Sequence, residues 1–152
     1  MQDFVHLHVH TQYSLLDGQA SVARLVDKAM KNGMKGIAVT DHGNMFGIKE
    51  FTNYVNKKNS GPKGEIKDLK KRIAGIEAGT VECEDKEAEI AACKAKIVEA
   101  ENKLFKPIIG CEMYVARRTM DLKEGKPDQS GYHLIVLAKN EKGYHNLIKL
   151  VS

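Results

Sequence analysis

The sequence contains little cysteine and no long run of apolar residues. Its three cysteines, Cys83, Cys93 and Cys111, are an odd number without a metal-type Cys-x-x-Cys motif, so we expect reduced thiols. No apolar stretch approaches the roughly 20 residues of a membrane helix. The first ten residues also lack the basic and then apolar pattern of a secretion signal. We therefore expect a cytoplasmic location and no membrane partner.

Two common catalytic motifs and a strong net charge are also missing. Neither the phosphate-binding loop GxxxxGK(S/T) nor the serine-hydrolase pattern GxSxG occurs. No run of basic and aromatic residues indicates a platform on which bases would stack. The net charge of +4 gives only weak support for a nucleic-acid partner. With 42% hydrophobic and 29% charged residues, the composition is that of one folded domain or of part of a larger one.

The hydrophobic pattern predicts alternating strands and helices, and hence an α/β fold. Ser21 is a suitable first-turn cap for the first helix, and Gly33 is a suitable stop. The β-α-β-α order at the start favours a parallel sheet with right-handed crossovers. The predicted elements are a strand over 3–9, a helix over 21–32, a buried strand over 36–40, a helix over 44–58, strands within 106–116 and 132–140, and an amphipathic helix over 141–152.

The segment 57–105 differs from the rest in being rich in charges of both signs and poor in aromatic residues. Two series of apolar residues recur there at heptad spacing, and the sequence GTVECED between them is long enough to reverse the chain. We predict an antiparallel helical hairpin, either as a solvated structural insertion or as a docking arm for protein or DNA. The two series are Ile66, Leu69, Ile73 and Ile76, and Ile90, Cys93, Ile97, Ala100 and Leu104.

Three of the six histidines, His6, His8 and His10, occupy alternate positions of the first predicted strand. Alternate side chains of a strand share a face and lie about 7 Å apart. Two histidines at a strand end can therefore converge on one ion, such as zinc, manganese or iron. The alternative for His8 and His10 is a hydrogen-bonded place in the core. This alternative is favoured for His6, which lies deeper in the strand.

Further candidate ligands follow the ends of other predicted strands. In parallel α/β folds, ligands collect beyond the carboxyl ends of the strands. Asp17 could instead make a local turn, and Asp41 is more typical of a turn or supporting residue than of a ligand. Glu112 lies among apolar neighbours and needs a partner, for which a metal ion is the favoured candidate. The residues at or near strand ends are Asp17, Asp41, His42, Glu112 and His133.

The polar segment 116–131 predicts a mobile loop near the mouth of this site. It contains Arg117 and Arg118, whose guanidinium groups are suited to contact phosphate. A solvated loop without such a role is the alternative.

Several blocks of the sequence resemble the PHP (polymerase and histidinol phosphatase) domain family, in the form found at the N-terminus of bacterial DNA polymerase III alpha subunits. The blocks are HLHVHTQYSLLDG, GIAVTDHGNMFG, KPIIGCEMYVA and YHLIVLAKNEKGYHNLIKLVS. The resemblance implies a distorted (β/α)7 barrel that binds up to three divalent metal ions, zinc or manganese. Residues 1–152 would then be the N-terminal part of such a barrel. Its elements would lie in 1–56 and 106–152, and the hairpin at 57–105 would be an insertion that the family usually lacks.

Carried over by position, the resemblance assigns six metal ligands, with Glu112 as a bridging carboxylate and further ligands after residue 152. The six are His8, His10, Asp17, His42, Glu112 and His133.

The same resemblance implies a parent replicative polymerase, a DNA-directed DNA polymerase and nucleotidyltransferase whose partners are DNA and other replicase subunits. The domain itself would be a metal-dependent phosphoesterase, and in some members it is a 3′–5′ proofreading exonuclease. The alternatives are a free-standing phosphoesterase of the histidinol-phosphatase type and a non-catalytic platform for the polymerase. Because a partial barrel leaves a strand edge unpaired, we also expect the chain to self-associate.

Overall fold

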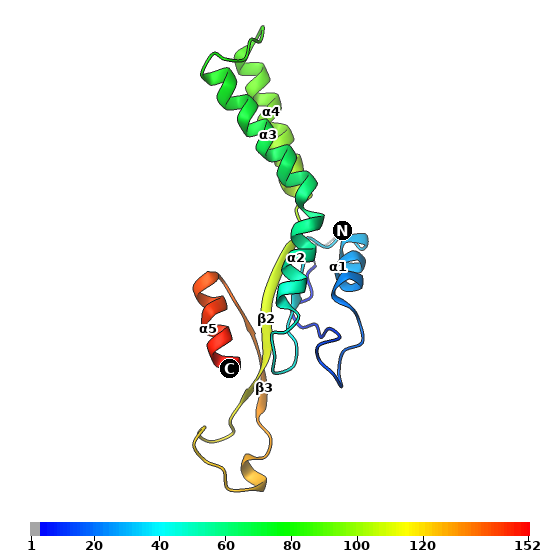
Figure 1. Ribbon diagram of the computed structural model, residues 1–152, viewed down its shortest axis with the longest axis vertical. Coiled ribbons are helices and arrows are strands. Elements are labelled where there is room, and N and C mark those ends of the chain that lie inside the picture. Colours follow the sequence, from blue (N-terminus) through cyan, green and yellow to red (C-terminus); the bar gives the residue numbers. More distant parts are fainter. Residues whose placement is uncertain (1–3) are drawn as a thin grey trace. The chain divides into compact units, whose positions relative to one another are not determined.

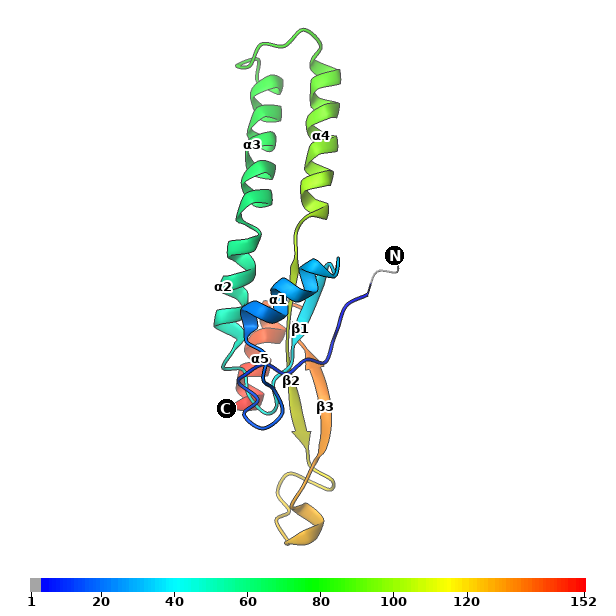
Figure 2. The ribbon, with the colours of Figure 1, turned by 90° about the vertical axis from the view of Figure 1, so that its right-hand side faces the viewer.

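The computed structural model describes residues 4–152, which form two compact units (Figures 1 and 2). One unit contains the chain up to Tyr54 together with Lys106–Ser152, and the other is Val55–Phe105. This described part holds five α-helices and three strands, which confirms the mixed α/β class. In chain order the elements are α1 (Val22–Lys31), β1 (Gly36–Val39), α2 (Ile48–Lys58), α3 (Ser60–Glu77), α4 (Lys86–Asn102), β2 (Lys106–Val115), a short 3₁₀ helix (Lys126–Asp128), β3 (Tyr132–Leu137) and α5 (Glu141–Val151).

The sheet of the first unit has the order β1-β2-β3. β1 and β2 run parallel, with Val39 opposite Ile109, as the predicted strand order requires. β3 runs antiparallel to β2, with His133 opposite Tyr114, so the expected parallel sheet is wrong for this pair. The connection between β2 and β3 explains the antiparallel direction, because residues 116–131 contain only one short 3₁₀ turn and no crossover helix. A parallel return needs such a crossover.

The strand predicted over residues 3–9 is not a regular strand over 4–9, and residue 3 lies outside the described residues. The segment nevertheless runs beside β1, because the amides of Ala38 and Thr40 donate to the carbonyls of His6 and Val9 at 2.9 Å. A bend at Leu7 separates these two contacts. The amide of Val9 donates to the hydroxyl of Thr40 at 2.8 Å instead of to a main-chain carbonyl. These two features interrupt the strand ladder.

The first helix forms as predicted, whereas the second starts later than predicted. Ser21 caps α1 by accepting from a first-turn amide, and Gly33 ends it with a φ of 77°. α2 begins at Ile48 and not at residue 44. The side chain of Asn44 accepts the amide of Phe46 at 3.2 Å, which holds a turn in place of the first helical turn.

Helices cover both sides of this sheet. α1 packs on β1 and α5 packs on β2, and the two helices lie on opposite sides in Figures 1 and 2. Apolar residues of these elements form the core. The hydrophobic residues with at most 3% exposure in this unit are Val22, Val26, Ala29, Ile37, Ala38, Val39, Ile48, Phe51, Cys111 and Leu147.

In the second unit, α3 and α4 pack side by side in antiparallel directions (Figure 2). Ile76, Cys93 and Ala100 are buried, and all three belong to the predicted heptad series. The side chain of Asn59 joins the two ends of this unit. Its amide nitrogen donates to the main-chain carbonyl of Phe105 at 2.8 Å, and its amide oxygen accepts from the main-chain amide of Phe105 at 2.9 Å. That this unit is an insertion in a barrel stays a prediction.

Cys83, Cys93 and Cys111 are free cysteines, in agreement with the expected reduced thiols. No helix within residues 4–152 has both the length and the apolar character that a membrane span needs.

Candidate metal centre

Glu112 of β2 lies at the centre of the predicted site. Its amide donates to the carbonyl of Asp41 at 3.1 Å, and its carbonyl accepts from the amide of Gly43 at 2.9 Å. The residue between these two, His42, therefore lies directly beside Glu112. Gly43 has a φ of 66°, a conformation that favours glycine and allows this tight turn. The end of β1 and the middle of β2 are thus joined where both carry candidate ligands.

The antiparallel direction of β3 brings His133 to the same place. His133 is the second residue of β3, and it pairs with Tyr114, which is near the end of β2. If β3 ran parallel to β2, its first residues would lie beside the start of β2 and far from this group. The sequence predicts His133 at the start of its strand, whereas the other candidate ligands lie near the ends of theirs. Because β3 runs antiparallel to β2, the start of β3 lies beside the end of β2.

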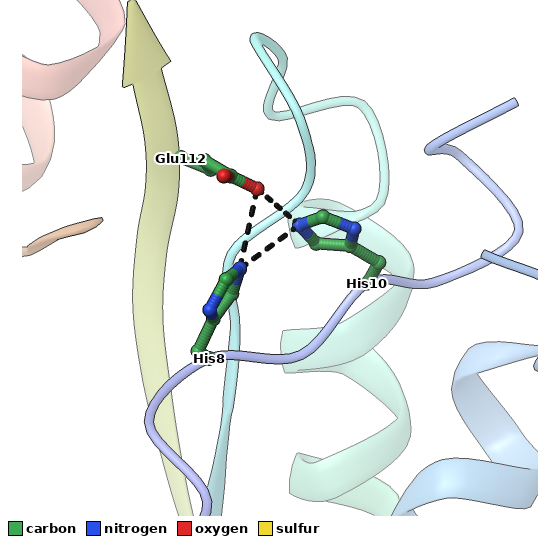
Figure 3. Close-up of side chains that lie close together, drawn as sticks. All are labelled: His8, His10 and Glu112. Atoms are coloured by element: carbon green, nitrogen blue, oxygen red, sulfur yellow. Dashed lines mark hydrogen bonds and ion pairs between the residues drawn. The ribbon is translucent and has the colours of Figure 1, made fainter. Parts of the chain in front are cut away.

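The first group of side chains consists of His8, His10 and Glu112 (Figure 3). Nε2 of His8 is 3.2 Å from Nε2 of His10 and 3.2 Å from Oε2 of Glu112. Nε2 of His10 is 2.5 Å from the same oxygen. The N-terminal segment therefore directs both imidazoles at one carboxylate oxygen.

The second group consists of His42, Glu112 and His133. Nδ1 of His133 is 2.7 Å from Oε1 of Glu112, which is the oxygen that the first group does not use. Nδ1 of His42 is 2.6 Å from Oδ2 of Asp17. Nε2 of His42 is buried and has no hydrogen-bond partner among residues 4–152. This group could therefore hold a metal ion.

Two of the three donor spacings in the first group fit a tetrahedral ion. Bonds of 2.0–2.1 Å to zinc place two ligands of a tetrahedral site about 3.3 Å apart. The two 3.2 Å separations made by His8 agree with this value, whereas Nε2 of His10 and Oε2 of Glu112 are closer, at 2.5 Å. Two imidazole nitrogens and a carboxylate oxygen belong to the ligand types of zinc and manganese.

The electrostatics of Glu112 favour a charged carboxylate. The residue is 5% exposed, and burial alone would raise its pKa. Hydrogen bonds from His8, His133 and His10 outweigh the burial, and the pKa of Glu112 is lowered overall. The side chain is therefore anionic at neutral pH.

The buried side chain of Asp41 holds together the loops that carry the candidate ligands. It is 1% exposed, and its Oδ1 accepts the amide of Thr11 at 2.6 Å and the hydroxyl of Ser14 at 2.7 Å. Oδ2 accepts the hydroxyl of Thr11 at 2.8 Å. The hydroxyl of Ser14 in turn accepts the amide of His42 at 3.0 Å. Asp41 thus ties the loop after the N-terminal segment to the turn after β1, in the supporting position favoured by the sequence.

His6 does not join either group. Its ring packs edge-on against Phe4, with centroids 4.7 Å apart, and the residue is exposed. The favoured interpretation of His6 as a core histidine is therefore wrong, because the bend at Leu7 turns this part of the segment toward solvent.

The two arginines of the 116–131 loop have protein partners. Arg118 contacts Asp128 at 2.5 and 3.0 Å and Glu124 at 3.0 Å. Arg117 donates to the hydroxyl of Ser130 at 3.2 Å. A phosphate contact of either arginine stays a prediction.

Tyr114 is a site residue that the sequence analysis did not select. Its ring centroid is 4.9 Å from that of His42 and 5.1 Å from that of His133. The signal was present, because Tyr114 follows Glu112 by two residues on one strand and therefore shares its face.

A mixed α/β unit in which histidines gather around a glutamate of the central strand is consistent with a PHP domain. The chain belongs to the PHP domain family, whose model matches residues 6–152. This result confirms the resemblance seen in the sequence.

Curated relatives carry the name DNA polymerase III subunit alpha. The protein from Borreliella burgdorferi is 41% identical over 98% of this chain and 9% of the relative. The proteins from Treponema pallidum and Aquifex aeolicus are 39% and 33% identical over 98% of this chain, and over 9% and 10% of their own lengths. The chain thus spans about a tenth of the length of these relatives.

Proposed function

We propose that this chain binds divalent metal ions at two neighbouring positions that share Glu112, and that it hydrolyses phosphodiesters there. One observation carries the proposal: the two carboxylate oxygens of Glu112 face two different groups of histidines. A carboxylate placed between two ions is typical of two-metal hydrolytic sites. Zinc or manganese suits this ligand set, and the family resemblance supports up to three ions in a complete domain.

The proposed ligands are those carried over from the family. Asp17 has a second possible role in this structure, because its carboxylate holds Nδ1 of His42. That contact fixes the imidazole with its Nε2 available, as carboxylate partners of metal-binding histidines do. The full set is His8, His10, Asp17, His42, Glu112 and His133.

Bound divalent ions lower the pKa of water and stabilise the negative charge that develops on phosphate oxygens. The chain's own contribution is to keep Glu112 charged and to hold His8, His10 and His133 against it. The proposed substrate is the 3′ end of DNA, so the activity is that of a 3′–5′ proofreading exonuclease. The names of the relatives support DNA as the substrate class.

We further infer that the chain is the N-terminal PHP domain of a replicative DNA-directed DNA polymerase. Its partners would then be DNA and other replicase subunits, and its location the cytoplasm. The relatives, which match over nearly the whole chain, support this inference. In this proposal residues 1–56 and 106–152 form the N-terminal part of a (β/α)7 barrel, and 57–105 is inserted between them.

Metal content measured by elemental analysis tests the proposal directly. We expect stoichiometric zinc or manganese in protein purified without chelator, and its loss in a His8→Ala/His10→Ala double variant. His145→Ala is the matched control, because this histidine lies on α5 with 62% of its side chain exposed. Equal metal in all three proteins, or none in any of them, would contradict the proposal.

Activity assays separate the proposed function from its alternatives. Hydrolysis of single-stranded DNA from the 3′ end supports the exonuclease. Hydrolysis of phosphomonoesters alone would instead favour the histidinol-phosphatase type. Metal binding without any hydrolysis would favour a structural platform for the polymerase.

Self-association is also part of the proposal. β3 is an edge strand of the sheet formed by the described residues, and Tyr132 and Leu134 on it are 61% and 53% exposed. Edge strands of this kind can pair with a second copy. Sedimentation velocity of the protein should show dimers at high concentration, and a monomer throughout would contradict this expectation.

A further inference from the structure

A cavity of about 400 Å³ adjoins the candidate metal centre. Its volume is within the range of small-molecule sites, roughly 300–1,000 Å³. Two candidate ligands, Asp17 and His42, form part of its wall. The remaining wall is mainly aromatic and aliphatic, and is contributed by Tyr13, Leu15, Leu16, Phe46 and Tyr114.

The apolar side chains around this cavity are unusually exposed. Leu16 is 99% exposed, Leu15 89% and Phe46 77%. Large apolar side chains gathered at an exposed hollow typically mark a binding site. These side chains border the candidate metal ligands. A molecular group that fills the cavity should therefore be joined to the group that is bound at those ligands.

Two side chains, Asn44 and Tyr13, connect the loops around the cavity. The amide nitrogen of Asn44 donates to the carbonyls of Tyr13 and His42, both at 3.1 Å. Its amide oxygen accepts from the main chain of Phe46 at 3.2 Å. The hydroxyl of Tyr13 donates to Glu50 at 2.8 Å. The main chain beside Tyr13 and Phe46, and the ring of Tyr13, are therefore held by the protein's own contacts.

Tyr114 connects the cavity to the metal centre. Its ring contacts those of His42 and His133 and is 58% exposed. A substrate whose phosphate lies at Glu112 would extend its neighbouring part over this ring and into the cavity. The part of a nucleic acid that matches flat, apolar walls is a nucleobase, which stacks on aromatic side chains.

We propose that this cavity binds the base of the 3′-terminal nucleotide of single-stranded DNA, stacked against Phe46 and Tyr114. The inference rests on the proposed phosphodiester hydrolysis and names the substrate subsite of the same centre. The side chain of Asn44 is already bonded to the main chain, and the hydroxyl of Ser14 is bonded to Asp41. The base would therefore be held by stacking, with little preference among the four bases.

Fluorescence of 2-aminopurine, which is quenched by stacking, tests the inference. The probe is an oligothymidylate with 2-aminopurine at its 3′ end, joined by a phosphorothioate that slows hydrolysis, in the presence of Zn²⁺. We expect saturable quenching by the purified protein. Phe46→Ala and Tyr114→Ala should each weaken binding about tenfold, as expected for the loss of one stacking partner. Phe46→Trp should retain it.

Met120→Ala is the matched control, since Met120 is an exposed apolar residue, 82% exposed, that does not border the cavity. Its quenching curve should equal that of the parent. Quenching that is absent, that is equal for a probe labelled at its 5′ end, or that is unchanged in Phe46→Ala would overturn the inference. The absence of quenching is also the result expected if the cavity binds a polypeptide in place of a base.

Hydrolysis of the same oligonucleotide without the phosphorothioate separates the two proposals. Hydrolysis without terminal quenching would reject the base subsite and support the hydrolytic function. Quenching that depends on Phe46, without hydrolysis, would support the subsite and reject the hydrolytic function. The absence of both would reject both.

Discussion

Glu112 and His133 lie on neighbouring antiparallel strands, and Oε1 of Glu112 is 2.7 Å from Nδ1 of His133. The strand partner of Glu112 is Ile135, so His133 reaches the carboxylate from the diagonal position two residues away. The other oxygen of the same carboxylate faces His8 and His10. One side chain therefore joins the N-terminal segment, β2 and β3 at a single point.

This shared position predicts unequal effects of substitution on metal stoichiometry. His133→Ala should remove the ion held with His42 and leave the one held by His8 and His10. Glu112→Gln should weaken both, by more than the roughly 10–100-fold seen for loss of an outer-shell partner. Calorimetric titration of chelator-treated protein with Zn²⁺ measures stoichiometry and affinity.

Glu141→Gln is the control for the Glu112 variant, because the Glu141 side chain is 90% exposed and lies outside both groups. It should bind zinc as the parent does. If Glu112→Gln kept the parent stoichiometry and affinity, the carboxylate would not be shared between two ions.

Asp41→Asn should destabilise the fold. The carboxylate is 1% exposed and accepts three hydrogen bonds from Thr11 and Ser14. An amide replaces one acceptor by a donor that faces these donors, which should lower the free energy of unfolding by about 2 kcal/mol. Urea denaturation of chelator-treated protein measures the change.

Asp121→Asn serves as the comparison for this variant, since Asp121 is exposed on the 116–131 loop. Its unfolding free energy should stay within about 0.5 kcal/mol of the parent value. An equal and small effect of both substitutions would show that the buried contacts of Asp41 contribute little.

Asn59→Ala should destabilise the helical unit. Asn59 is 5% exposed and makes a two-way contact with the main chain of Phe105. Removing it leaves a buried amide and a buried carbonyl without their partner, which should cost about 2 kcal/mol. Hydrogen exchange of the α3 and α4 amides should become faster, whereas Asn53→Ala, at an exposed position of α2, should leave it unchanged.

Asp128 should titrate below the ordinary aspartate range. Arg118 donates two hydrogen bonds to its carboxylate, and the amide of Glu124 donates another, which lowers the pKa of Asp128. A depressed folded-state pKa stabilises the folded loop above the unfolded value of about 3.9, and this contribution is lost as the pH falls through the folded value. Carbon NMR of the carboxyl group measures it.

Arg118→Gln should return the pKa of Asp128 toward the ordinary value and increase the mobility of residues 116–131. An unshifted pKa in the parent protein would show that the contacts of Arg118 are not maintained in solution. Arg118 would then be available for phosphate, as the sequence suggested.

The parts of the fold that sequence predicted are those set by local patterns. Residues 36–40 form a short apolar run between turn residues, and the observed strand β1 covers all but the last of them. Ser21 and Gly33 supplied the start and stop of α1. Glu112 was recognisable because a carboxylate among apolar neighbours needs a partner.

The parts that sequence did not predict depend on contacts between distant segments. The direction of β3 is decided by the length and content of its connection to β2, and not by the residues of β3 itself. The sequence contains no run of basic and aromatic residues, yet the fold brings Tyr13, Phe46 and Tyr114 around one cavity from three separate segments. The prediction for His6 was wrong because it placed this residue deep in a regular strand, whereas the segment bends at Leu7 and His6 is exposed.

The three thiols should differ sharply in reactivity. Cys111 is 0% exposed and donates to the carbonyl of Asp41 at 3.3 Å, and burial raises its pKa. Cys93 is 3% exposed, whereas Cys83 is partly exposed. Because the thiolate is the reactive form, a disulfide reagent at pH 8 should modify one thiol per native chain and all three after unfolding in guanidinium. Cys83→Ser should leave no rapidly reacting thiol, and a rapid reaction of Cys111 in that variant would show that the β2 region opens readily in solution.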